Sequence, residues 1–169
     1  SSAASGMWTM DQVAYWVKQG IWPNPANPAN DPYYEYVSLL LTGDGTNGAQ
    51  NNTFLDSSTN NFTITRNGNT TQGSFSPYGP NWSNYFDGSG DYLVPTSTTI
   101  ANFGSSDFTV ECWINVLSLG ITLCIMDARS ANNATQMLFQ VESDNKVKFG
   151  NQTSYLVAST TTVSVGVWM

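Results

Sequence analysis

Few side chains in this sequence could carry out acid–base or nucleophilic chemistry. There is no histidine, and there are only two cysteines among 169 residues, which excludes Ser–His triads, Cys–His pairs and most zinc sites. Glycan hydrolysis needs two carboxylates that face each other across the sugar. Glu111 lies in the predicted central strand, whereas Glu35 and Glu142 lie on distant segments. We therefore expect that the protein is not an enzyme.

The aspartates of Gly-rich loops are the candidate metal ligands. Asp44, Asp87 and Asp91 lie in such loops, and carboxylate and carbonyl oxygens are the ligands that calcium prefers. The spacing DGSGD at 87–91 does not match an EF-hand. The alternative is that these aspartates form turns, for which Asp-Gly is well suited. We expect no cofactor, with calcium as the one candidate metal.

Aromatic side chains near the surface are the candidates for sugar binding, which combines ring platforms with polar hydrogen-bonding groups. These candidates lie in or near predicted loops and on the predicted central strand: Tyr78, Trp82, Tyr85 and Trp113. The alternative for each ring is packing in the core or against another subunit.

The charge pattern excludes several kinds of partner. The net charge is −7, and the few basic residues are scattered along the chain: Lys18, Arg66, Arg129, Lys146 and Lys148. Nucleic acids and anionic membranes attract clustered basic residues, so neither partner is expected. Only 10% of the residues are charged, and a surface of Asn, Ser, Thr and Gly is typical of β-rich extracellular or virion proteins. No apolar run is long enough to predict a transmembrane helix.

Alternating apolar and polar residues predict the strands that position these side chains. The longest alternation, DFTVECWINV at 107–116, predicts a central strand with one buried face. An Asn-Gly pair within 66–69 predicts a hairpin turn. Further strands are expected at 33–41, at 61–65 and 70–75 on the two sides of this turn, in two pieces of 85–95, at 121–126, and three times between 137 and 159, with turns at 143–146 and 150–152.

Two cysteines add one open question to this pattern. Cys112 and Cys124 are separated by one predicted turn. They are interpreted as small buried core residues, or as a disulfide if their strands are neighbours.

The N-terminal segment 1–22 predicts a short helix that needs a partner surface. Thr9 and Gln12 form a capping box, and Gly20 ends the helix. Apolar residues on and beside one helical face are the candidates for docking on a partner: Trp8, Met10, Val13, Trp16, Val17 and Trp22. The alternative is that the helix packs on its own domain. Prolines in the stretch 23–35 favour an extended linker between this segment and the domain.

Several short motifs occur in the same order as in a known family. LLL-x-G-D-G, F-x-DSS-x-NNFT, F-DGSGDYL and DFTVECWIN together resemble the laminin-G-like, concanavalin-A-like domain, in the version common in bacteriophage virion proteins. The resemblance covers about residues 36–169 and implies an all-β, antiparallel jelly-roll sandwich. In that family a V-x-V-G-x-W segment leads into further strands. The sandwich at 36–169 is therefore expected to be incomplete, and either a longer polypeptide or a partner subunit would supply those strands.

The resemblance also implies a function. We expect a virion structural protein, as a tail fibre, appendage or capsid decoration, attached to other virion proteins by its N-terminal segment. Such proteins commonly form homo-oligomers, most often trimers, and the exposed domain would contact a host-surface glycan. The alternative is a secreted, calcium-dependent carbohydrate-binding module of a cellular protein, located outside the cell.

Overall fold

A computed structural model describes the chain at residue 18 and over 33–43, 53–73, 75–77, 82–97, 99–101, 103–104, 106–129, 136–151 and 153–169. The chain divides into two compact units, Ser1–Ser97 and Thr98–Met169. Among the described residues strands predominate and helix is almost absent. The structure therefore agrees with the expected all-β class. The predicted N-terminal helix lies outside the described residues.

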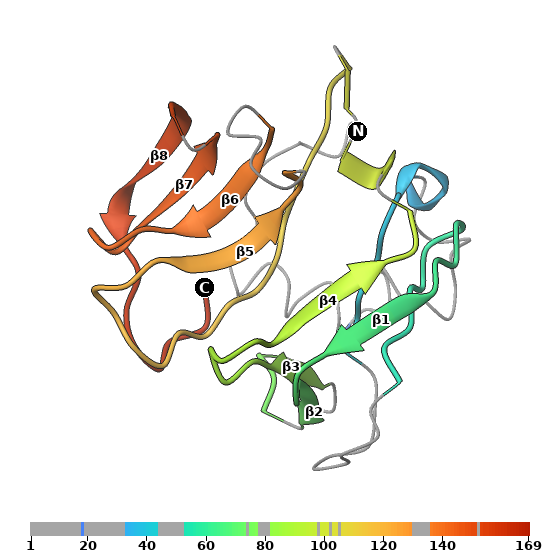
Figure 1. Cartoon of the computed structure of the whole chain (residues 1–169), viewed down its shortest axis with the longest axis horizontal. Coiled ribbons are helices and arrows are strands. Elements are labelled where there is room, and N and C mark those ends of the chain that lie inside the picture. The colour runs from blue at the N-terminus through green and yellow to red at the C-terminus, as the bar shows by residue number, and fades with distance from the viewer. Residues whose placement is uncertain are drawn as a thin grey trace. The chain divides into compact units, whose positions relative to one another are not determined.

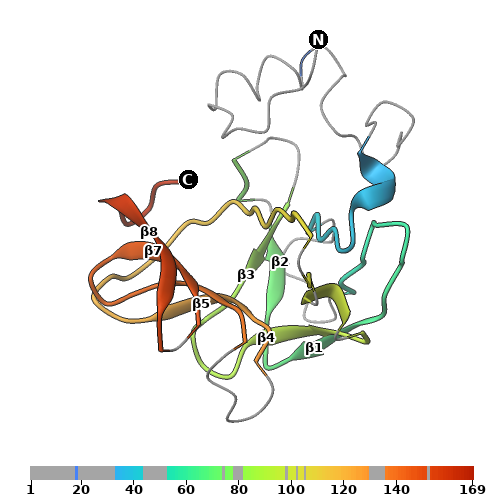
Figure 2. The same cartoon turned by 90° about the horizontal axis from the view of Figure 1, so that it is seen from above.

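The described residues of the first unit include two pairs of short strands. They are β1 (Ile64–Asn67), β2 (Thr71–Gly73), β3 (Ser83–Tyr85) and β4 (Tyr92–Pro95). β1 pairs with β4 and β2 pairs with β3, and both pairs are antiparallel (Figures 1 and 2). The chain thus runs along one bent path through β1 and β2, and returns along a second bent path through β3 and β4.

The Asn-Gly pair forms a corner in this arrangement and not the predicted hairpin. The strands on its two sides, β1 and β2, pair with different strands. Gly68 has a φ of +69°, which favours glycine, and a Cβ added there would lie 2.1 Å from Oδ1 of Asp91. The N–H of Asn69 donates to the same oxygen at 2.7 Å. The prediction of a turn is confirmed. The prediction of a hairpin is wrong, because β1 pairs with β4 and not with β2.

A buried carboxylate organises the start of the first unit. Asp56 is 3% exposed, and its Oδ1 accepts the N–H groups of Leu40 and Ser58, both at 2.9 Å. Its Oδ2 accepts the Ser58 hydroxyl at 2.8 Å and the Phe62 N–H at 2.9 Å. Burial alone would raise the pKa of this carboxyl, but the hydrogen bonds outweigh it and lower the pKa. One carboxylate thereby joins three stretches of chain.

The segment before Asp56 differs from the predicted strand at 33–41. A 3-10 helix, η2 (Tyr34–Tyr36), takes its first half, and Leu41 forms only an isolated bridge with Asp56. The Tyr34 hydroxyl donates to the carbonyl oxygen of Ser57. The end of the predicted linker 23–35 is therefore attached to the domain by a side-chain hydrogen bond.

A four-stranded antiparallel meander dominates the second unit, which also holds a second 3-10 helix, η3 (Thr99–Ala101). Its strands are β5 (Leu123–Asp127), β6 (Leu138–Val141), β7 (Lys146–Gly150) and β8 (Tyr155–Thr162), in that spatial order (Figure 1). The predictions for 121–126 and for three strands between 137 and 159 are confirmed.

The two faces of this sheet differ in character. Leu123, Val141 and Val147 lie opposite one another across β5, β6 and β7, and they pack in the core of the unit beside Val116 and Val163. The next row across the sheet has the polar residues Gln140 and Lys148 at its centre, between Cys124 and Ala158. The sheet therefore has an apolar face towards the core and a polar face on the opposite side.

The predicted central strand at 107–116 is wrong for most of its length. Only Asn115 and Val116 form bridges, with Trp168 and Val165. Phe108 is 46% exposed and stacks on Phe103, with 4.1 Å between ring centroids. Alternation describes how a strand would bury its side chains, but the described residues 107–112 form no β-bridge.

The interpretation of the cysteines as core residues is also wrong. Cys112 and Cys124 are both free and both exposed. Cys124 lies on the polar face of the sheet, beside Gln140.

Candidate functional site

The structure describes five of the predicted metal and sugar residues. Trp82, Tyr85, Asp87 and Asp91 lie in the first unit, and Trp113 lies in the second. Trp82 and Trp113 are half-buried, and Tyr85 is exposed. The remaining candidates lie outside the described residues: Asp44, Tyr78 and the docking residues Trp8, Met10, Val13, Trp16, Val17 and Trp22.

Three exposed aromatic residues flank the loop between β3 and β4. Tyr85 ends β3, Phe86 follows it, and Tyr92 begins β4. Their exposed fractions are 49%, 45% and 54%. We call Tyr85, Phe86 and Tyr92, with the loop 87–91 between them, the aromatic corner.

Hydrogen bonds fix the loop of the aromatic corner. Oδ2 of Asp91 accepts the N–H of Asp87 at 2.9 Å, and Oδ1 of Asp87 accepts the N–H of Ser89 at 2.7 Å. Gly88 and Gly90 have φ values of +83° and +75°, a backbone conformation that glycine adopts without steric cost. The loop is thus held closed, and the aromatic residues are presented at its two ends.

The same hydrogen bonds show how the two aspartates of the corner are used. The N–H of Asp87 is the main reason why the pKa of Asp91 is lowered, and the N–H of Asn69 adds to the effect. The carboxylates of both aspartates thus accept backbone N–H groups of the loop or of its neighbour Asn69. Calcium takes six to eight oxygen ligands. Within the described ranges no three acidic, cysteine or histidine residues gather into a metal-binding group.

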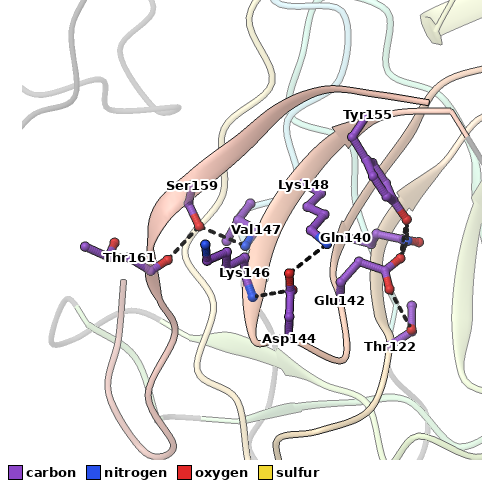
Figure 3. Close-up of polar contacts among 10 residues, drawn as sticks. All are labelled: Thr122, Gln140, Glu142, Asp144, Lys146, Val147, Lys148, Tyr155, Ser159 and Thr161. Atoms are coloured by element: carbon purple, nitrogen blue, oxygen red, sulfur yellow. Dashed lines mark hydrogen bonds and ion pairs between the residues drawn. The ribbon is translucent and has the colours of Figure 1, made fainter.

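A second cluster of polar side chains lies on the polar face of the β5–β8 sheet (Figure 3). Glu142 accepts hydrogen bonds from the Tyr155 hydroxyl and the Gln140 amide, and from the Thr122 hydroxyl at 3.4 Å. The amide of Gln140, a residue only 5% exposed, also reaches the Tyr155 hydroxyl at 2.9 Å. We call Thr122, Gln140, Glu142, Lys148 and Tyr155 the polar network.

The charges of the polar network are balanced locally. Nζ of Lys148 lies 2.8 Å from Oδ2 of Asp144 and 5.0 Å from the centroid of the Tyr155 ring. The hydrogen bond between Tyr155 and Glu142 lowers the pKa of the carboxyl and raises the pKa of the phenol. Both pKa values are thus shifted further from pH 7. Glu142 is therefore ionised near pH 7, and its oxygens serve as hydrogen-bond acceptors.

Sequence reasoning found only part of these two surfaces. It named Tyr85 but not Phe86 or Tyr92, although both flank the same DGSGD loop. Glu142 was noted only as an isolated glutamate, because Tyr155 and Gln140 reach it through pairing of β6, β7 and β8. No sequence motif marks that contact.

Comparisons with known proteins add no relative to this description. No protein-family model, curated protein or solved structure matches the chain. No described helix is long and apolar enough to cross a membrane.

Proposed function

We propose that this protein is a bacteriophage virion structural protein, as a tail fibre, appendage or capsid decoration, that presents a lectin-like domain to host-surface glycans. Its N-terminal segment attaches it to other virion proteins, and the domain is an antiparallel jelly-roll sandwich. The protein is non-catalytic, forms a homo-oligomer, with a trimer favoured, and is located in the virion.

The observation that carries the glycan-binding part is the aromatic corner. Sugar rings offer apolar C–H faces that pack on aromatic rings, while their hydroxyls need polar partners. Tyr85, Phe86 and Tyr92 are exposed on a loop that hydrogen bonds hold closed. A surface that is ordered before the ligand arrives binds with a smaller entropy cost.

The expectation of a non-catalytic protein is supported by the polar network. A glycosidase needs one carboxylic acid whose pKa is raised and a second carboxylate beside it. Glu142 has a lowered pKa, and the pKa of nearby Asp144 is lowered by Lys148. These two carboxylates are therefore ionised at neutral pH, which suits hydrogen bonding to hydroxyl groups.

A glycan microarray tests the role of the aromatic corner. We expect the full chain to bind one class of surface glycans and the double variant Tyr85→Ala, Tyr92→Ala to lose that binding. Tyr36→Ala is the matched control, because Tyr36 is 76% exposed but belongs to η2. Equal binding by all three proteins would contradict the proposed site.

The alternative is a secreted, calcium-dependent carbohydrate-binding module. In that case the aspartates of the loop 87–91 would be the candidate calcium ligands. The hydrogen bonds of Asp87 and Asp91 to backbone N–H groups leave fewer lone pairs for a cation. We therefore expect glycan binding to persist after calcium is removed by a chelator. Loss of binding with the chelator, and recovery with added calcium, would favour the alternative.

A further inference from the structure

β8 is the last strand in the order of the β5–β8 sheet, so it is an edge strand among the described residues. β8 pairs with β7 on one side, and the strand order places no described strand on its other side (Figures 1 and 2). An edge strand carries a row of N–H and C=O groups that can pair with another strand. β8 has eight residues, which is enough for a stable ladder.

Both faces of β8 are exposed. Leu156 is 75% exposed and Val157 is 63% exposed. Ala158 follows Val157 in regular register, so it points to the opposite face, and it is exposed as well. The core of the unit gathers Leu123, Val141 and Val147 from β5, β6 and β7. Apolar side chains that stay exposed on both faces of an edge strand are typical of a surface that another chain covers.

The shape of β8 limits how many strands can be added to it. Phe149 lies opposite Val157 and Gly150 lies opposite Tyr155, so Leu156 has no opposite residue. A second bulge follows at Ser159, whose hydroxyl accepts the N–H of Val147 at 3.1 Å. Bulges bend a strand and increase its twist. A bent edge strand can pair with one partner strand, but it does not favour the addition of many further strands in a flat sheet.

Charge indicates which partner fits this edge. The chain has a net charge of −7, so two copies repel each other over most of their surfaces. Residues 149–169, which include all of β8, contain no charged side chain. A second acidic copy can therefore approach β8 without meeting a charged side chain of this segment.

We propose that β8 pairs antiparallel with β8 of a second copy of this chain, about a two-fold axis next to Val157, so that the two Val157 side chains lie opposite each other. A two-fold axis brings the same strand from both copies together in opposite directions, and it closes the assembly after one contact. The pairing joins two four-stranded sheets into one and covers Leu156 and Val157. It predicts an even number of copies, so a trimer formed by the N-terminal segments would occur as a hexamer, and without that trimer the assembly would be a dimer.

Sedimentation velocity of the full chain over a wide dilution series tests this contact. The variants are Val157→Lys and Val157→Glu, each measured alone and in an equimolar mixture. Leu117→Lys is the control, because Leu117 is 62% exposed in the same unit but lies outside β8. Far-UV circular dichroism confirms that each variant is folded.

The expected pattern has three parts. The wild-type chain and the Leu117→Lys variant form even-numbered assemblies. Each Val157 variant dissociates with a dissociation constant raised at least about tenfold, because apolar contact is lost and like charges face each other across the axis. The mixture of the two variants recovers association, because Lys then faces Glu.

Four results would overturn the proposal: a wild-type chain that is monomeric at every concentration, an odd-numbered assembly, Val157 variants that associate like wild type, or a mixture that stays dissociated. The last result is informative because a folded pair with opposite charges must recover if strand pairs with strand. The proposal does not depend on glycan binding.

Discussion

Replacing Asp56 by Asn is the sharpest test of how the first unit is held together. The two side chains have nearly the same shape, so the change removes a charge and turns one acceptor oxygen into a donor NH₂. The buried carboxylate accepts N–H groups of Leu40, Ser58 and Phe62. Asn can keep its oxygen towards Leu40 and Ser58, but its NH₂ then faces the N–H of Phe62.

The size of the effect follows from these contacts. A hydrogen bond to a charged group contributes about 1.5–3 kcal/mol, and a buried donor left without a partner costs about 1–3 kcal/mol. The Ser58 hydroxyl can rotate to accept from the new NH₂, so only the Phe62 bond is fully lost. We expect a loss of about 2–4 kcal/mol, a large part of a typical free energy of unfolding of about 5–15 kcal/mol.

Urea unfolding and native-state hydrogen exchange measure this loss. Exchange of the Leu40 and Phe62 amides reports opening of the first unit by itself, which matters because two compact units need not unfold in one step. Asp87→Asn is the matched control, because Asp87 is exposed and accepts the N–H of Ser89. The reasoning is refuted if Asp56→Asn costs no more than Asp87→Asn.

The same residue makes stability depend on pH in a defined direction. The pKa of Asp56 is lowered in the folded chain, against about 3.9 for an unfolded aspartate. The stabilisation is therefore fully present above the unfolded pKa and is lost as the pH falls towards and through the folded pKa. Asp56→Asn should flatten the acid side of the stability profile, and an unchanged acid profile would contradict this assignment.

The remaining predictions concern three other positions. Gly68→Ala should lower the free energy of unfolding of the first unit, measured in urea, by more than Gly88→Ala. Both glycines have a positive φ, which costs an alanine about 1–2 kcal/mol, but only a Cβ at position 68 would clash with Asp91. Equal losses for the two variants would contradict this contact. Tyr155→Phe should raise the pKa of Glu142, followed by NMR titration, because the Tyr155 hydroxyl is the main cause of its lowering; an unmoved pKa would contradict the polar network. Cys112, although exposed, should react slowly with iodoacetamide at neutral pH, because desolvation and Glu111 raise the pKa of its thiol to about 11, and the thiolate is the nucleophile; reaction as fast as a free thiol would contradict this.

Sequence was most informative where strands pair with their neighbours in the chain. β6, β7 and β8 follow one another through short turns, so alternation and turn residues determine both the strands and their pairing. Asn145, with a φ of 63°, is one such turn residue. Local patterns suffice for a meander of this kind.

Sequence was least informative where pairing depends on distant residues. The Asn-Gly turn at Gly68 was visible, but β1 finds its partner in β4, and this made the turn a corner. The buried role of Asp56 could not be predicted, because its donors Leu40 and Phe62 are brought to it by the fold. At 107–116 the pattern predicted a strand, but a strand also needs a neighbour to pair with.

We propose that the protein belongs to a virion and is attached to it by its N-terminal segment. Co-sedimentation with purified particles of the source phage tests this most directly, with the wild-type chain compared with the double variant Trp8→Ala, Trp16→Ala. We expect the wild-type chain to sediment with the particles and the variant to stay in solution while it keeps its glycan binding. A wild-type chain that never sediments with the particles would contradict the account.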